Sequence, residues 1–189
     1  FNENSLHFLN HGDLTKYPLI HERLDRFKLF VKKNNIEIDQ VILDSSIVMS
    51  LYGIRKCNDI DYLSVNTNIK YHDGLIENHA SELSFHQEEK NALIMDPSLY
   101  FYYDDLKFVS FSQLYKMKKN RLEKKDKIDL VLMEAFVEHN LVKAWAGKAQ
   151  QKLYFFTVKV RLRVIDILRI LGMYEFLRYV YRTLKRVDK

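Results

Sequence analysis

The chain has 189 residues, of which 47% are hydrophobic and 29% charged, and its formal net charge is +5. This balance excludes a disordered chain and fits one globular domain with a hydrophobic core and a short appendage. The single cysteine excludes a disulfide framework and a cysteine-based zinc site. Five glycines and two prolines disfavour an all-β fold with many tight turns.

The positive charge is concentrated near the C-terminal end. Residues 152–189 hold ten Lys or Arg against three Asp or Glu, a net charge of +7, so the other 151 residues sum to −2. Because the basic character belongs to this segment alone, the pattern does not indicate nucleic-acid binding by the whole domain.

Two helices and two strands are predicted in the first third of the chain. Residues 21–34 repeat apolar side chains at helical spacing until two asparagines end the pattern. Residues 40–44 are a short apolar run with β-branched side chains, typical of a buried strand. Residues 45–53 open with two serines that can cap a helix and close with a glycine. Residues 59–65 alternate apolar and polar side chains, which predicts a second strand.

The middle of the chain predicts a hairpin and a further helix. Residues 91–96 fit either a short helix or a strand. Residues 100–103 and 106–111 predict two strands joined by a two-residue connection. We expect Ser112 to cap a helix that starts at Gln113.

The C-terminal part is expected to be helical. We predict a break near residues 124–127 and a second candidate break at Gly147. From about residue 157 to residue 187 the pattern predicts two helices that meet at Gly172. The chain as a whole therefore predicts an α/β (α+β) fold, with a small mixed sheet flanked by helices and a C-terminal helical region.

The residues with the clearest chemistry are Asp59 and Asp61. Alternation along a strand puts both carboxylates on one face, about 7 Å apart. Two carboxylates at that separation can hold a hard cation, and Mg²⁺ or Mn²⁺ prefers such oxygen ligands together with substrate phosphates. The sequence therefore predicts a Mg²⁺ or Mn²⁺ site at Asp59 and Asp61.

Ser45, Ser46 and Arg55 are the candidate phosphate ligands. The two serines begin a predicted helix, where free N–H groups and hydroxyls can hold a phosphate, although they are equally explained as helix caps. Arg55 could bind a substrate phosphate or pair with one of the two aspartates. Charge neutralisation and in-line positioning of this kind serve phosphoryl or nucleotidyl transfer.

The segment from Val41 to Val65 resembles the nucleotidyltransferase superfamily that includes DNA polymerase β. That family shows a strand, a glycine-led helix start and then an Asp-x-Asp strand, and many small members have a helix that ends in Leu-Tyr-Gly. Here these features are Leu51-Tyr52-Gly53, Arg55 and Asp59-Ile60-Asp61. The resemblance implies a metal-dependent transferase in which Asp59 and Asp61 are catalytic metal ligands and a nucleotide-bearing molecule is the donor.

A later segment extends the resemblance, so that it covers about half of the chain. Residues 116–133 are similar to the family's helical segment of lysine, arginine and aspartate. The basic residues here could also form a solvated face, and Asp126 and Asp129 are expected to pair with nearby lysines. On this reading residues 1–150 are the nucleotidyltransferase-like domain and residues 151–189 are a basic amphipathic helical tail.

The chain departs from the family pattern at two points. The helix start carries Asp44 and two serines in place of glycine, and an acidic Asp44 beside a triphosphate would be repulsive unless it binds metal or points away. The family also has a third catalytic carboxylate on a later strand, for which Glu82, Asp96 and Asp105 are the candidates.

Two other functions fit the same aspartates. Metal-dependent glycosyltransferases use an Asp-x-Asp motif to hold Mn²⁺ or Mg²⁺ against the diphosphate of a nucleotide sugar. A degenerate, non-catalytic domain that binds a partner or a glycan is the third hypothesis. The expected ligand is thus a nucleotide or a nucleotide sugar, with a role in polysaccharide or glycolipid assembly.

The tail is a candidate for contact with a membrane surface. Residues 173–189 place apolar side chains on one helical face and basic side chains beside it. Such a helix can pack on the domain, bind a partner or lie on an anionic membrane. We expect a cytoplasmic protein, and peripheral membrane attachment through residues 173–189 is one of these three alternatives.

Overall fold

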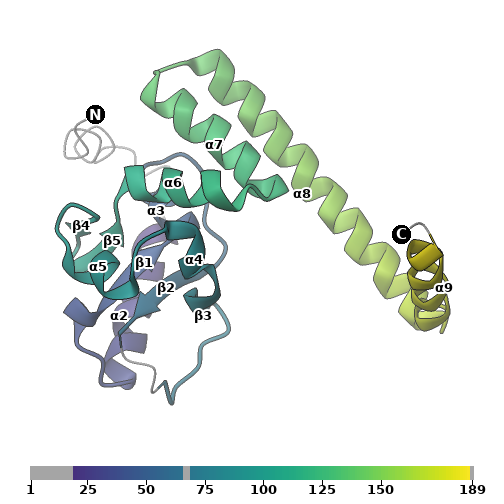
Figure 1. The fold of residues 1–189 in the computed structure, drawn as a ribbon, viewed down its shortest axis with the longest axis horizontal. Helices are drawn as coiled ribbons and strands as arrows, with labels where there is room; N and C mark the ends of the chain where they lie inside the picture. Colours follow the sequence, from purple (N-terminus) through teal and green to yellow (C-terminus); the bar gives the residue numbers. More distant parts are fainter. Residues whose placement is uncertain (1–18, 66–68, 188–189) are drawn as a thin grey trace.

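The computed structural model describes residues 19–65 and 69–187, and it gives only the backbone of Val180, Tyr181 and 183–187. It has a five-stranded mixed sheet flanked by helices, followed by a C-terminal helical region (Figure 1). The predicted α/β class is therefore confirmed.

The sheet has the order β3-β2-β1-β5-β4. Its strands are β1 (Val41–Asp44), β2 (Ile60–Ser64), β3 (Ile76–Asn78), β4 (Tyr100–Tyr103) and β5 (Leu106–Val109). β1 pairs antiparallel with β2 and parallel with β5, while β3 runs parallel to β2 and β4 antiparallel to β5. The apolar central strand β1 is buried throughout, because helices cover both faces of the sheet.

The predicted strands at 40–44 and 59–65 and the predicted hairpin are confirmed. β4 and β5 are joined by Asp104 and Asp105, which both have positive φ, at 49° and 59°. This is the backbone that a two-residue hairpin turn requires, and aspartate tolerates it better than most residues. Residues 91–95 are helical, as part of α5 (Lys90–Met95), and Asp96 follows the helix in an extended conformation.

One face of the sheet is covered by α2 (Leu19–Lys33), as predicted. Its apolar stripe includes Phe27 and Phe30, whose rings lie 5.7 Å and 5.3 Å from the ring of Tyr62 on β2. The helix gives way to a turn at Asn34–Asn35, where Asn35 takes a left-handed φ of 51°. Because side chains alternate along a strand, Tyr62 faces α2 and Asp61 faces the opposite side.

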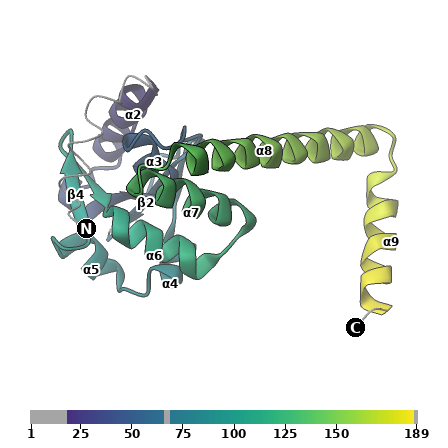
Figure 2. The same cartoon turned by 90° about the horizontal axis from the view of Figure 1, so that it is seen from above.

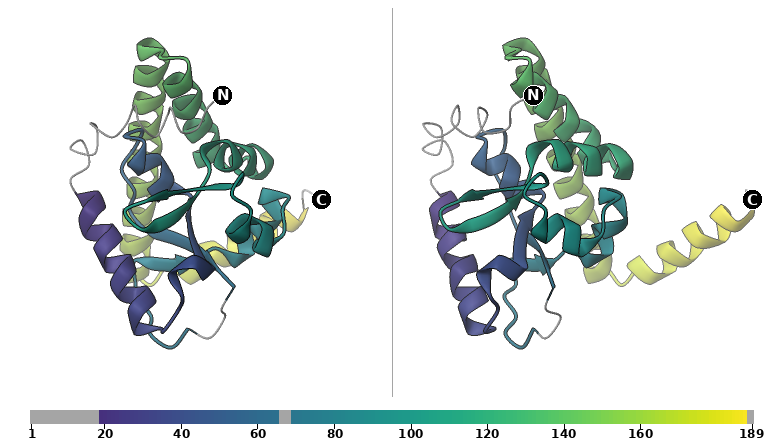
Figure 3. Two further views of the ribbon diagram at one scale, coloured as in Figure 1. Left: turned by 90° about the vertical axis from the view of Figure 1, so that its left-hand side faces the viewer. Right: turned by 60° about the vertical axis from the view of Figure 1, so that its left-hand side comes forward.

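The opposite face carries the short helix α4 (Leu83–His86) and α6 (Phe111–Arg121), so the two helical layers lie on either side of the sheet (Figures 2 and 3). Gln113 of α6 donates to the carbonyl of His86 at 2.8 Å, and Asn120 donates to the carbonyl of Phe85 at 2.8 Å. These two amides hold α4 in place.

The start of α6 corrects one prediction. Ser110 caps the helix, because its hydroxyl accepts from the N–H of Gln113 at 3.3 Å, and Ser112 already lies inside the first turn. The predicted break at 124–127 lies slightly earlier, at Leu122, which has a φ of 52°. The next helix, α7 (Lys124–Val137), starts with a capping box between Glu123 and Asp126.

A second correction concerns Gly147, which does not break a helix. α8 (Leu141–Ile170) runs through it without interruption, so the helix predicted from about residue 157 begins at Leu141. A Cβ at Gly147 would lie 2.7 Å from a methyl group of Leu132 on α7, so the glycine allows these two helices to pack closely. The division of the chain near residue 150 stays a prediction.

The predicted corner at Gly172 is confirmed. Gly172 has a φ of 68°, and the N–H of Met173 returns to the carbonyl of Leu168 at 3.0 Å, as in a glycine-based helix end. The chain then continues into α9 (Tyr174–Val187). Within the described residues, every helix is too short or too polar to cross a membrane.

Candidate functional site

Asp59 and Asp61 lie beside the turn that joins β1 to α3 (Ser46–Leu51). The hydroxyl of Ser46 donates to Oδ1 of Asp59 at 3.1 Å. Asp61 pairs with Asp44 across the antiparallel strands β1 and β2. The pairing of the strands therefore brings the Ser-Ser turn and the start of the Asp-x-Asp strand to the same end of the sheet, as the sequence had led us to expect.

The two aspartates differ in their exposure to solvent. Asp59 is exposed and comes just before the strand begins, whereas Asp61 lies within β2 and is only 6% exposed. Burial is the main reason why the pKa of Asp61 is raised to about 6; His79 counteracts it, and the charges of Asp59 and Asp44 add to it. A cation at this position would relieve the same electrostatic penalty.

Asp44 is fully buried, and its carboxylate accepts several hydrogen bonds. Its Oδ1 accepts from the N–H of Ser45 at 2.6 Å, and its Oδ2 lies 3.0 Å from Nε2 of His86 and 3.4 Å from Nδ1 of His79. Burial opposes its ionisation, but the hydrogen bonds from the two histidines outweigh burial and hold the pKa of Asp44 well below its usual range. Asp44 is thus a buried carboxylate with its own partners.

His79 connects the two carboxylates. Its Nδ1 faces Asp44, and its Nε2 lies 3.7 Å from Oδ2 of Asp61. Burial favours the neutral ring, but the hydrogen bond to Asp44 and the charge of Asp61 raise the pKa of His79. In its protonated form the imidazole compensates part of the negative charge of the two carboxylates.

Ser45 has an unusual backbone for a residue with a side chain. Its φ and ψ are 65° and −126°, a combination that glycine adopts readily and serine does not. The hydrogen bond from its N–H to Asp44 accompanies this conformation. The turn thus has the backbone of a glycine-led turn, although serine stands there.

Arg55 does not point to either aspartate of the Asp-x-Asp pair. Its Nε lies 2.9 Å from Oδ1 of Asp129, and Asp129 also accepts from Nζ of Lys118 at 2.8 Å. Lys118 is 1% exposed, and its ammonium group lies 3.4 Å from Asp126 as well. The expected pairing of Asp126 and Asp129 with a lysine is confirmed, and Arg55 belongs to this buried charge cluster.

The three candidates for a third carboxylate are engaged in structural contacts. Glu82 accepts from Arg121 at 3.2 Å. Asp96 accepts from the backbone and the hydroxyl of Ser98, at 2.9 Å and 2.7 Å, and Asp105 forms the β4–β5 turn. The register of β2 and β3 instead places Glu77 opposite Asp61. Glu77 is exposed, and the alternation of strand residues puts it on the same face.

The sequence did not single out Asp44, His79 and His86 as one cluster. A cluster formed by a strand, a strand end and a short helix has no local spacing that a sequence pattern could reveal. His72, another histidine of this middle part of the chain, is exposed, and its neighbour Asp73 pairs with Arg26 through two hydrogen bonds of 2.8 Å.

The donor set suits a cation that is bound together with its substrate. Across the described part of the chain, no group of three or more His, Cys, Asp or Glu side chains is arranged to hold a metal ion. Asp59 and Asp61 could supply two carboxylate ligands, and Mg²⁺ commonly completes its shell with water and substrate phosphates. The exposed Lys125 lowers the pKa of Asp61 by its charge, so a cationic side chain is also within electrostatic range of the pair.

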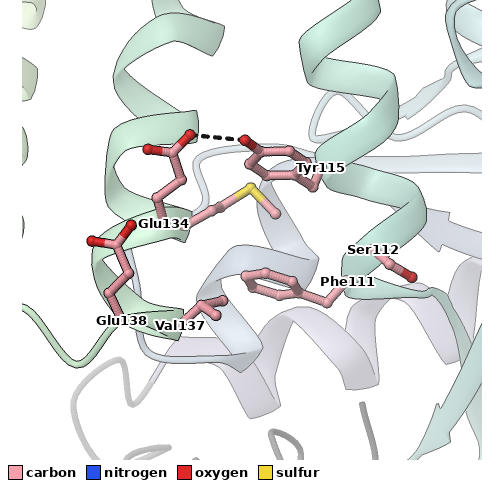
Figure 4. A pocket seen from close by; sticks show the side chains of 7 residues that line it. Phe111, Ser112, Tyr115, Glu134, Val137 and Glu138 are labelled. Carbon is pink, nitrogen blue, oxygen red and sulfur yellow. Dashed lines mark hydrogen bonds between the residues drawn. The ribbon is translucent and has the colours of Figure 1, made fainter. Parts of the chain in front are cut away.

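A separate apolar cavity of about 310 Å³ lies between α6 and α7 (Figure 4). It is lined by Phe111, Met133 and Val137, and Tyr115 donates to Glu134 at its edge at 2.8 Å. Neither aspartate of the Asp-x-Asp pair lines it, so this cavity is distinct from the candidate metal site.

Comparisons of the chain with protein-family models, with curated proteins and with solved structures find no match. The candidate site therefore rests on its own geometry and on the pattern of residues from Val41 to Val65.

Proposed function

We propose that this chain is a divalent-metal-dependent transferase that acts on a nucleotide-bearing donor. The observation that supports the proposal is the position of Asp59 and Asp61 beside the β1–α3 turn, with Asp59 bonded to Ser46 and Asp61 opposite Asp44. A bound Mg²⁺ or Mn²⁺ would neutralise the phosphate charge that builds up during nucleotidyl transfer.

In this proposal Asp59 and Asp61 are the catalytic metal ligands. Asp59 is exposed and can bind a cation without rearrangement of the core, and Asp61 gains from a positive charge because burial disfavours its ionised form. Ser45 and Ser46 lie beside the pair and would contact the phosphates of the donor. Lys125 supplies a positive charge from the start of α7, whereas Arg55 acts indirectly, by holding Asp129.

Asp44, His79 and His86 would position the metal ligands and handle a proton. Asp44 orients His79 through Nδ1, so that Nε2 faces Asp61. His79 is a candidate general base for the attacking hydroxyl, because its second nitrogen faces the site. Glu77, on the neighbouring strand, is the candidate third carboxylate.

The identity of the donor separates transfer of a nucleotide from transfer of a sugar. Thermal unfolding would be followed with Mn²⁺ and either a nucleoside triphosphate or a nucleotide sugar. A ligand at about 100 times its Kd stabilises the native state by about 2.7 kcal/mol, or roughly 5–10 °C for a domain of this size. We expect the triphosphate to give the larger shift.

Substitutions test whether the ligand-induced shift in unfolding temperature depends on the two aspartates. Asp59→Asn and Asp61→Asn should each abolish the metal-dependent stabilisation, while Asp25→Asn, an exposed aspartate of α2, should retain it. A shift with nucleotide sugars alone would favour glycosyl transfer. The absence of a shift with either ligand would favour the non-catalytic domain and contradict the proposal.

A further inference from the structure

The long helix α8 has two parts with different surroundings. Its first turns pack on α7, where Gly147 lies against Leu132, and the rest projects away from the sheet domain (Figures 1 and 2). Thirty residues of α-helix span about 45 Å. Much of this length is therefore presented to solvent.

The face of α8 turned away from α7 carries a continuous apolar stripe. At about 100° per residue its members fall within a sector of roughly 100°. Their side chains are between 44% and 78% exposed. The stripe consists of Val142, Trp145, Leu153, Phe156, Val160, Val164, Ile167 and Leu171. An exposed apolar stripe of this length marks an interaction surface.

Basic side chains border the stripe mainly along one edge. Lys148, Lys152, Lys159 and Arg163 follow one edge at helical spacing, and Arg161 lies beyond the other edge. None of these five has an acidic partner within 4.0 Å among the described residues, whereas Arg169 is 3.9 Å from Asp166. The border of the stripe is thus positively charged and largely uncompensated.

The apolar stripe and its basic border together favour one kind of binding partner for α8, an anionic lipid surface. α8 is too polar to cross a bilayer. A second copy packed stripe to stripe would bring two basic borders together, and like charges at such an interface cost free energy. A surface of anionic lipid headgroups accepts both features, because apolar side chains enter the headgroup boundary while lysine and arginine remain among the phosphates.

We propose that α8 is a membrane-surface helix, which binds anionic lipid through the stripe from Val142 to Leu171. The Gly172 corner leads into α9, which adds the exposed apolar residues Phe176 and Leu177 beside the basic Arg178. This assignment extends the expected contact from residues 173–189 back along the whole of α8, and it does not depend on the transfer reaction.

The single tryptophan of the chain gives a direct readout. Trp145 lies on the stripe and is 74% exposed. With phosphatidylcholine–phosphatidylglycerol vesicles, its emission should shift to shorter wavelength as it leaves water, and vesicles of phosphatidylcholine alone should give a smaller shift. Equal responses to both vesicles, or no shift with either, would overturn the proposal.

Vesicle sedimentation of the full chain measures separately how much the apolar stripe and its basic border each contribute to lipid binding. Phe156→Asp should reduce binding at least tenfold, while Leu29→Asp, a half-exposed leucine of α2, should leave it unchanged. Each basic residue near the surface contributes about fivefold to binding. Lys159→Glu combined with Arg163→Glu should therefore reduce binding about 30-fold or more, unlike Lys32→Glu on α2.

Sedimentation equilibrium without lipid tests the competing occupant. A monomer whose vesicle binding is lost in the Phe156 variant supports the membrane assignment. A stable dimer that this variant dissociates, with vesicle binding equal to that of the Leu29 control, would place a second copy on the stripe and contradict it.

Discussion

Asp44 and Asp61 lie opposite each other on β1 and β2, and the imidazole of His79 lies close to both. The two carboxylates have opposite electrostatic environments. Hydrogen bonds lower the pKa of Asp44 despite its burial, whereas burial raises the pKa of Asp61 to about 6. Paired groups with such divergent pKa values are typical of functional sites. In our account Asp44 is the structural member of the pair and Asp61 the reactive one.

The raised pKa of Asp61 predicts how metal binding depends on pH. A cation competes with the proton on Asp61, so Mn²⁺ affinity should rise up to about tenfold per pH unit below pH 6 and level off above it. Titration calorimetry at several pH values would measure this. Affinity that stays constant between pH 5 and pH 6 would argue against Asp61 as a ligand.

The raised pKa of Asp61 also predicts that replacing its carboxylate with an uncharged amide stabilises the fold. The folded pKa of Asp61 lies above the unfolded value, so the folded state holds the proton more tightly and loses stability as pH rises from about 4 to about 6. At neutral pH without metal, Asp61→Asn should therefore raise the free energy of unfolding by up to ~3 kcal/mol. Urea denaturation provides the measurement, and a destabilised Asn variant would show that Asp61 is held by favourable contacts instead.

The buried pair of Asp44 and His86 predicts a large loss of stability. His86→Leu removes one hydrogen bond from a fully buried carboxylate and should cost about 3 kcal/mol. His72→Leu, at an exposed histidine, should change stability little. Thermal unfolding of both variants tests the difference, and equal stabilities would refute the assigned role of His86.

The neighbours Lys118 and Lys119 give a matched test of the charge cluster. Lys118 is buried between Asp126 and Asp129, and Lys119 is exposed on the same helix. Lys118→Met leaves uncompensated buried charge and should cost about 3 kcal/mol, whereas Lys119→Met should cost less than about 0.5 kcal/mol. Similar denaturation midpoints for the two variants would contradict the cluster.

The backbone of Ser45 predicts that glycine is preferred there. Ser45→Gly removes the steric strain of a φ of 65° with a ψ of −126° and should stabilise the fold by about 1 kcal/mol. Ser46→Gly, at the first residue of α3, should not stabilise it. Calorimetric melting of the two variants would distinguish them, and a loss of stability in Ser45→Gly would mean that the turn is not strained.

The elements that local patterns determine were predicted well. The apolar spacing around Phe27, the buried strand before Asp44, the two-residue Asp104–Asp105 turn and the corner at Gly172 all follow from short-range rules. The position of Asp59 and Asp61 beside the serine turn also followed from the order of strand, helix and strand.

The remaining features depend on contacts between distant segments. No local pattern distinguishes the buried Lys118 from the exposed Lys119, since α7 decides which lysine meets Asp129. Gly147 was expected to break a helix because glycine is a poor helix former, but the close approach of α7 and α8 explains it. The partners of Asp44 come from α4 and the end of β3, which the sequence did not connect with the site.

The most direct test is a Mn²⁺ titration followed by the electron paramagnetic resonance signal of the free ion. We expect a mixture of the wild-type chain and a nucleoside triphosphate to bind more Mn²⁺ than the nucleotide alone, and we expect Asp59→Asn and Asp61→Asn each to remove this excess. Wild-type binding equal to that of the nucleotide alone, or binding that both variants retain, would contradict the proposed metal site.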